Sequence, residues 1–350
     1  MAYIHSLARA LPEFSIQQNQ IQEFARSVFE GSNLDLNRLL PVFKNSIIEK
    51  RPVLKDIEWY SKSKSFKEKN QEFLENSLVL GKLACERAIL KANLSPKDID
   101  GFIVVTSSGF VTPTLDARLI DILNLREDIL RMPLTGLGCA GGAFGLARAN
   151  ELAKIYPDKN ILLLAVETCT LTFRPDDKRK ANLIALSLFS DGACALVLNS
   201  KPKANSIQLL GSHSYKWKDS LNVMGWDVEQ DGLQVIFDKS IPSLINKNYL
   251  EIFSNFINLF KLNNDDIIHF LYHPGGKKVL DAFQSALNIK EEKLSYSTTI
   301  LKNHGNMSSP TVLFVIDEFI ESKNFQSGEK GIIGAMGPGF TSESLLFETT

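Results

Sequence analysis

Short apolar runs of strand length alternate with longer amphipathic stretches along this chain, and that alternation restricts it to an α/β fold. In the first half, the apolar runs predict strands at Gly101 to Thr106, Ile161 to Glu167 and Ala193 to Leu198. The amphipathic stretches predict helices over Ile16 to Phe29, Phe73 to Ala92 and Leu115 to Leu123. Such a chain buries its strands in a sheet and covers the sheet with helices.

The second half of the chain repeats this alternation. Its pattern predicts strands at Ile207 to Leu210, Phe270 to Tyr272 and Gly331 to Ala335, and helices at Tyr249 to Phe260, Lys277 to Leu287 and Pro310 to Ser322. The 350 residues exceed the usual size of one domain. We therefore expect two similar halves, residues 1–200 and 201–350.

Charge and cysteine usage exclude several functions. The 39 Lys and Arg nearly balance the 40 Asp and Glu, so no overall field attracts nucleic acid or an anionic membrane. The one charge run of note, Lys62 to Lys69, is expected to be a solvated face. The cysteines occur singly, at Cys85, Cys139, Cys169 and Cys194, which predicts a reducing compartment and no metal site. With no apolar run long enough to span a membrane, a cytoplasmic location is expected.

Cys139 stands in the sequence Gly-Leu-Gly-Cys-Ala-Gly-Gly, directly before a stretch rich in small residues that predicts a closely packed helix. A sulfur at a helix N-terminus is favoured as the anion, and a nearby imidazole lowers its pKa further. This setting predicts a nucleophile. Cys85 and Cys194 lie in apolar segments and are expected to be core residues.

Two further motifs supply a base and an amide. His273 follows an apolar strand and precedes Pro-Gly-Gly, so it is expected at a strand end facing a cleft. Asn306 lies in His-Gly-Asn-Met-Ser-Ser-Pro, before a helix, where a helix N-cap is the ordinary role of Asn. A thiol that carries an acyl group needs a base, and a carbonyl that gains charge needs donors. Cys139, His273 and Asn306 together fit those needs.

As a set, these motifs resemble the type III polyketide synthases, the chalcone-synthase-like branch of the thiolase superfamily. The resemblance covers essentially the whole chain and is carried by residues 138–142, 167–174, 188–193, 273–276, 305–309 and 337–341. It implies a five-layered αβαβα thiolase fold, a homodimer, and a catalytic triad of Cys139, His273 and Asn306. It also implies acyl-CoA and malonyl-CoA as substrates, with no metal or other cofactor.

Within the family, residues 112–119 and 136–143 look like those of bacterial alkylpyrone and alkylresorcinol synthases. Of the two gating phenylalanines of the plant enzymes, Phe189 matches one, whereas the other position falls on Val235. The smaller gate predicts a long-chain fatty acyl starter, because each buried methylene contributes roughly 0.8 kcal/mol. The further residues expected to line the substrate site are Ser107, Cys169, Thr172, Gly275, Gly276, Gly337, Pro338 and Gly339. The coenzyme-A phosphates are assigned to Arg38, Lys44, Lys50 and Arg51.

The resemblance leaves open more than one product and more than one related enzyme class. Triketide or tetraketide α-pyrones are favoured over alkylresorcinols, because closure by an enol oxygen needs no further catalytic residue. An initiating 3-oxoacyl-[acyl-carrier-protein] synthase shares the triad but differs around His273 and Asn306. A hydroxymethylglutaryl-CoA synthase would need a catalytic Glu, and a thiolase a second Cys near the C-terminus. A non-catalytic lipid-binding relative would have lost a triad residue.

Overall fold

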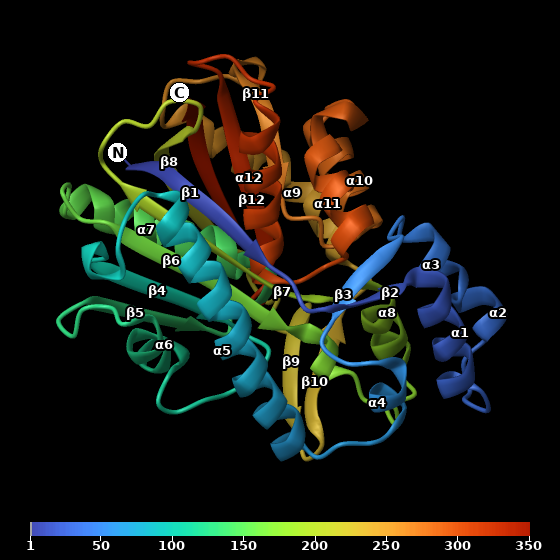
Figure 1. The fold of residues 1–350 in the computed structure, drawn as a ribbon. Coiled ribbons are helices and arrows are strands. Elements are labelled where there is room, and N and C mark those ends of the chain that lie inside the picture. The colour runs from blue at the N-terminus through green and yellow to red at the C-terminus, as the bar shows by residue number, and fades with distance from the viewer. Residues whose placement is uncertain (1) are drawn as a thin grey trace.

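The computed structural model describes residues 2–350 (Figure 1). The strands are β1 (Ala2–Ala10), β2 (Phe14–Gln17), β3 (Lys50–Val53), β4 (Gly101–Thr106), β5 (Leu130–Thr135), β6 (Ile161–Thr168), β7 (Asp191–Asn199), β8 (Ile207–Lys216), β9 (Met224–Glu229), β10 (Gly232–Phe237), β11 (Ile267–Tyr272), β12 (Lys330–Gly337) and β13 (Thr341–Thr349). The α-helices are α1 (Gln18–Phe29), α2 (Leu36–Leu39), α3 (Pro41–Asn45), α4 (Ile57–Ser61), α5 (Phe66–Lys91), α6 (Leu115–Leu123), α7 (Gly141–Ile155), α8 (Lys180–Leu188), α9 (Ile241–Asn258), α10 (Lys277–Leu287), α11 (Ser295–His304) and α12 (Ser309–Ser322).

The strands of both halves meet in one mixed sheet. Its nine strands run in the order β11-β12-β13-β8-β1-β7-β6-β4-β5. Five of them come from the first half of the chain and four from the second. The two groups are joined by β1 and β8, which pair only at Ala2 with Leu209 and Tyr3 with Gln208. Two separate two-stranded sheets, β2 with β3 and β9 with β10, lie outside this large sheet.

Helices form the other layers. Residues of α7 and α12 share one buried core with strands of both halves, so these two helices form the middle layer. They pack closely, because a Cβ at Gly142 would lie 2.2 Å from the carbonyl oxygen of Ser309. Helices α5 and α6 cover the outer face of the first group of strands, and α9, α10 and α11 cover that of the second (Figure 1). The result is the five-layered αβαβα arrangement that the sequence predicts.

A smaller cap lies beside one end of the layers. It consists of β2, β3 and helices α1 to α4, which pack on α8 through a cluster that includes Phe24, Phe43 and Leu183 (Figure 1). The β9–β10 hairpin lies next to α8 and completes this side of the molecule. The cap matters for function because it closes over the residues that follow β6 and precede β7.

The secondary structure agrees closely with the expected pattern in the most periodic segments. Strand β4 and helices α6 and α10 have the predicted bounds. Helix α9 begins at Ile241, eight residues before the prediction, with a proline in its first turn. The charge run differs from expectation at one residue, because Lys69 is only 5% exposed and donates to the carbonyl of Phe173 at 2.9 Å. Among residues 2–350, no helix is both long and apolar enough to cross a membrane.

Candidate active site

Cys139 lies in a short 3-10 turn, Gly138–Ala140, that leads directly into α7. The turn needs glycine at position 138, where φ is +49° and a Cβ would lie 2.7 Å from Cδ of Pro338. The thiol is at the predicted helix N-terminus but is 6% exposed. Burial raises the pKa of the thiol to about 11, although its hydrogen-bond contacts with Ser308 and Asn306 lower the pKa. Burial therefore opposes the thiolate that the helix N-terminus favours.

Asn306 joins the three predicted catalytic segments. The Sγ of Cys139 lies 3.8 Å from the Oδ1 of Asn306 and donates to it. The same Oδ1 accepts from the backbone N–H of Ser308 at 2.8 Å, and Nδ2 donates to the carbonyl of Gly275 at 3.2 Å. Since Gly275 is two residues from His273, the amide links the cysteine turn to the histidine turn. This arrangement is not an N-cap, because helix α12 begins only at Ser309.

His273 follows the last residue of β11, at the strand end where the sequence placed it. Its backbone N–H donates to the carbonyl of Gly334 on β12 at 2.7 Å, which fixes the turn. The ring is 3% exposed, and neither Nδ1 nor Nε2 has a hydrogen-bond partner among the described residues. Burial alone lowers the pKa of the imidazole to about 3, so the ring is neutral near pH 7. A neutral ring with both nitrogens unpaired can accept a proton at one and donate one at the other.

Glu167 is a buried acid beside the nucleophile that sequence reasoning did not single out. It is 0% exposed and accepts from Ser309 Oγ at 2.7 Å, from the N–H of Ser107 at 2.9 Å and from Ser108 Oγ at 2.7 Å. Ser107 in turn accepts from the N–H of Gly138 at 2.8 Å. Glu167 thereby connects the cysteine turn to the start of α12. The only signal in the sequence was a charged residue at the end of an otherwise apolar strand.

The pH dependence of stability should show this burial directly. Burial raises the pKa of Glu167 to about 7 from an ordinary 4.5, so the folded state binds an extra proton between these values. Its contribution to the free energy of unfolding is therefore full below pH 4.5 and is lost as pH rises through 7. Relative to Glu167→Gln, wild-type stability should fall by roughly 3 kcal/mol between pH 4.5 and 8, from 1.36 kcal/mol per pKa unit. Denaturant unfolding at several pH values measures this difference.

The exposed Glu30 supplies the control, because Glu30→Gln should follow the wild-type curve at every pH. If the free energies of unfolding of wild type and Glu167→Gln change in parallel from pH 4.5 to 8, the pKa of Glu167 is not raised.

The glycine-rich loops predicted to bind substrate surround the same site. A Cβ at Gly337 would lie 2.5 Å from the carbonyl oxygen of Leu137, so the segment Gly337, Pro338 and Gly339 packs on the cysteine turn. Gly275 accepts from Asn306, as described, and Gly276 precedes α10 with φ of +155°. These glycines allow close approach of backbone to the catalytic side chains.

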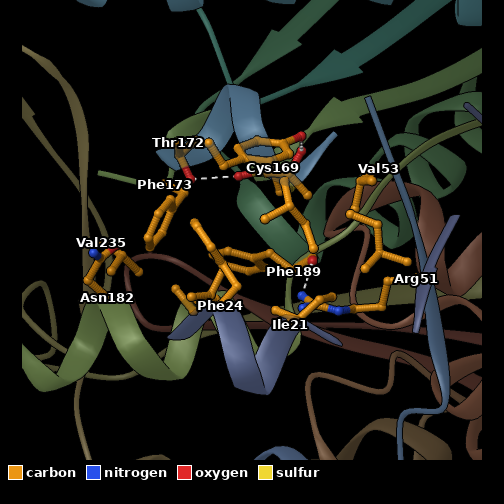
Figure 2. A pocket seen from close by; sticks show the side chains of 16 residues that line it. Ile21, Phe24, Arg51, Val53, Cys169, Thr172, Phe173, Asn182, Phe189 and Val235 are labelled. Atoms are coloured by element: carbon orange, nitrogen blue, oxygen red, sulfur yellow. Dashed lines mark hydrogen bonds between the residues drawn. The ribbon is translucent and has the colours of Figure 1, made fainter. Parts of the chain in front are cut away.

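A mainly apolar cavity lies on the cap side of this site (Figure 2). Four residues predicted to line the substrate tunnel line it: Cys169, Thr172, Phe189 and Val235. The other walls come from the cap and α8 and include Ile16, Ile21, Phe24, Val53, Ile57, Phe173 and Leu186. The ring of Phe189 packs against Trp226 and Phe237 of the β9–β10 hairpin, with centroids 5.6 and 5.5 Å apart. Ser107 is not a wall residue and instead belongs to the Glu167 network.

Of the four cations assigned to coenzyme A, three are exposed and one is buried. Arg38, Lys44 and Lys50 are exposed, on α2, α3 and the start of β3. Arg51 is 2% exposed and is a wall residue of the cavity, so it lacks the solvent-facing position that a phosphate ligand would need. Among residues 2–350, no group of three or more His, Cys, Asp or Glu side chains could hold a metal ion.

Five layers around a buried cysteine, histidine and asparagine are the arrangement of the thiolase fold. Residues 1–202 match the N-terminal domain of chalcone and stilbene synthases, and residues 217–350 match the C-terminal domain. The chain therefore belongs to the chalcone and stilbene synthase family, that is, to the type III polyketide synthases.

Individual relatives support this assignment over the full length. A putative chalcone synthase from Bacillus subtilis is 41% identical over 359 residues, which cover 99% of this chain and 98% of that protein. A 1,3,6,8-tetrahydroxynaphthalene synthase from Streptomyces peucetius subsp. caesius is 32% identical over 350 residues, covering 99% and 92%. The crystal structure of the 1,3,6,8-tetrahydroxynaphthalene synthase from Streptomyces coelicolor A3(2), a bacterial type III polyketide synthase, matches with a TM-score of 0.95 at 25% identity, covering 99% of both chains.

Proposed function

We propose that this polyketide synthase is an acyltransferase that loads a long-chain fatty acyl-CoA on Cys139, extends it with malonyl-CoA and releases alkyl-α-pyrones. The observation that carries the proposal is that Asn306 links Cys139 to the turn of His273, whose imidazole nitrogens have no partner among residues 2–350. Substrates arrive as coenzyme-A thioesters, and no other cofactor takes part. The exposed Arg38, Lys44 and Lys50 are the side chains proposed to bind the phosphates.

Loading begins with a neutral thiol and a neutral imidazole. His273 accepts the proton of Cys139 as the sulfur attacks the starter carbonyl, and the proton then passes to the departing thiolate of coenzyme A. The charge that develops on the carbonyl oxygen would be costly in so buried a site without a donor.

Extension uses the same imidazole as a donor. His273 and Asn306 hold the thioester carbonyl of malonyl-CoA while its carboxylate leaves as carbon dioxide, and they stabilise the resulting enolate. The enolate carbon attacks the acyl carbonyl on Cys139, which forms the new carbon–carbon bond and releases the cysteine sulfur. The extended chain can return to Cys139 for another cycle, or an enol oxygen can close the pyrone ring.

The cavity supports a fatty starter. Its walls are mostly apolar, and each methylene that leaves water for such walls gains roughly 0.8 kcal/mol. Val235 occupies a position where a phenylalanine would fill the space between Cys169 and the ring of Phe189, the residues with which it shares a buried cluster. In this proposal, the acyl chain passes Val235 on its way from Cys139 into the cavity.

Starter length is therefore expected to depend on Val235. Val235→Phe should lower kcat/KM for palmitoyl-CoA by about tenfold or more relative to acetyl-CoA, since two or three lost methylene contacts amount to about 2 kcal/mol. Val228→Phe is the matched control, because Val228 lies on the same hairpin but is 61% exposed. An unchanged ratio of palmitoyl-CoA to acetyl-CoA rates in Val235→Phe would show that the chain does not pass this residue.

Alkylresorcinols are the alternative product. Their aldol closure needs an acid near the acyl chain, and Glu167 is a carboxyl of raised pKa beside Cys139. Its oxygens already accept three hydrogen bonds from serine side chains and backbone, which favours a fixed structural group. The pyrone is accordingly the proposed product.

A homodimer in the cytoplasm completes the proposal. Strand β5 is at the end of the large sheet, and its residues alternate between half-buried and exposed, so one edge is available for a second copy. All four cysteines are unpaired and buried, which fits a reducing compartment.

Mass spectrometry of the products formed from palmitoyl-CoA and malonyl-CoA tests the proposed reaction. Alkyl-α-pyrones with a C15 tail would support it. If product forms with acetyl-CoA or an aromatic acyl-CoA as starter but not with palmitoyl-CoA, the fatty starter is wrong. If the product masses match alkylresorcinols, the α-pyrone is wrong. No product from any coenzyme-A starter, with product from an acyl carrier protein, would favour the initiating synthase.

A further inference from the structure

Arg51 is a buried cation that the reaction described above does not use. It lies on β3, is 2% exposed, and is the only positively charged wall residue of the apolar cavity (Figure 2). Burying a guanidinium is costly unless it makes specific hydrogen bonds. The contacts of Arg51 therefore indicate which part of the structure its burial stabilises.

The guanidinium binds the backbone of the gate residue. Nη1 of Arg51 donates to the carbonyl oxygen of Phe189, whereas the buried Nε has no partner among residues 2–350 (Figure 2). The negative charge of Asp191 favours the protonated guanidinium and opposes the effect of burial, which lowers the pKa of Arg51 to about 9. Asp191 itself is held by the N–H of Leu54 at 2.9 Å and by the N–H of Thr170 at 2.8 Å.

The segment that Arg51 binds is the one that fixes Asn306. The N–H of Asn306 donates to the carbonyl of Leu188 at 2.9 Å, and the N–H of Ser190 donates to the carbonyl of Asn306 at 3.0 Å. Phe189 thus stands opposite Asn306 in a one-residue parallel bridge. The carbonyl of Phe189 points away from this bridge, to Arg51.

Arg51 also packs on the other side of the bridge. A Cβ at Gly305 would lie 2.8 Å from both Cγ and Cδ of Arg51, so the methylenes lie against the residue before Asn306. One side chain therefore contacts both strands of the bridge, the 188–190 segment through its guanidinium and Gly305 through its stem. Apart from the contact of its Sγ with Asn306, Cys139 is held by the Gly138 turn, Ser107 and the Gly337 segment.

We propose that Arg51 is a positioning residue for Asn306, which it fixes through the Phe189 carbonyl and the Gly305 contact, so that it governs malonyl decarboxylation more than acyl loading. The inference rests on the proposed roles of Asn306 and Cys139. Loss of the guanidinium frees the 188–190 segment and lets the Asn306 amide shift relative to His273. A shift of about 1 Å in a catalytic group can reduce a rate about 100-fold.

The test measures the two half-reactions separately in Arg51→Met, Arg51→Lys and the control Arg26→Met. Decarboxylation is followed as carbon dioxide release from malonyl-CoA alone, and loading as the mass increase of the protein with palmitoyl-CoA alone. Arg51→Met should reduce decarboxylation by about 10- to 100-fold, with loading changed by less than about threefold. Arg51→Lys, which keeps one donor and the charge, should recover part of the loss. Arg26 is exposed on α1, and its variant should match wild type in both steps.

Several results would overturn the proposal. Equal losses in the two half-reactions would indicate general damage to the site, and unchanged decarboxylation in Arg51→Met would show that Arg51 does not position Asn306. If Arg51→Met does not fold, the same comparison in Arg51→Lys decides. If the wild-type protein neither takes up the palmitoyl group nor decarboxylates malonyl-CoA, the proposed function itself is wrong.

Discussion

Cys139→Ala is expected to form no polyketide product while keeping the native fold. The sulfur is the proposed nucleophile, so its loss should reduce turnover by more than about 10³-fold. Alanine is smaller than cysteine and fits the same 3-10 turn, whose neighbours are glycine and alanine. Product mass spectrometry with palmitoyl-CoA and malonyl-CoA measures the turnover, and intact mass measures acylation.

Cys194→Ala provides the matched control. Cys194 is buried, like Cys139, but it lies within β7, and its thiol donates to a backbone carbonyl. This variant should retain turnover and acylation. Acylation that survives in Cys139→Ala would mean that another residue carries the acyl group.

Asn306→Asp should separate decarboxylation from loading. The aspartate keeps an oxygen that can accept from the N–H of Ser308 but removes the amide donor from the site. Loss of one donor to a developing oxyanion costs about 10²–10³ in rate. Carbon dioxide release from malonyl-CoA should fall by that factor, whereas palmitoylation of Cys139 should persist.

Asn303→Asp is the control for this substitution. Asn303 is three residues away on α11 and outside the contacts of the catalytic amide. A decarboxylation rate for Asn306→Asp within about threefold of this control would show that Asn306 does not stabilise the transition state of decarboxylation.

The sequence predicted the elements whose side chains keep a strict period. Helices α6 and α10 and strand β4 could be located to the residue because each buries one regular face or both faces. Strand β5 contains a proline and lies at the sheet edge, where pairing on one side tolerates it, so its pattern resembles a loop. The β9–β10 hairpin is half exposed and gives a similarly weak signal.

At the site, the sequence identified residue types but not burial. Cys139, His273 and Asn306 stand in turns whose glycines mark them, and the structure brings these turns together. Arg51 and Lys69 are cations, and composition alone places cations in solvent, yet both are buried against backbone carbonyls. Partners such as the carbonyl of Phe189 are distant in sequence, so no local pattern can reveal them. Glu167 was missed for the same reason, because its three donors come from two remote loops.

The central position of β1 has a consequence for synthesis on the ribosome. Ala2–Ala10 leaves the ribosome well before its main partner β7, which ends at Asn199, and before its other neighbour β8, which comes later still. At about 5–20 residues per second, translation needs roughly 10–40 s to supply β7. Throughout that interval an apolar strand destined for the middle of the sheet has no neighbour on either side. The nascent chain must therefore keep this nine-residue strand from pairing elsewhere until β7 has been synthesised.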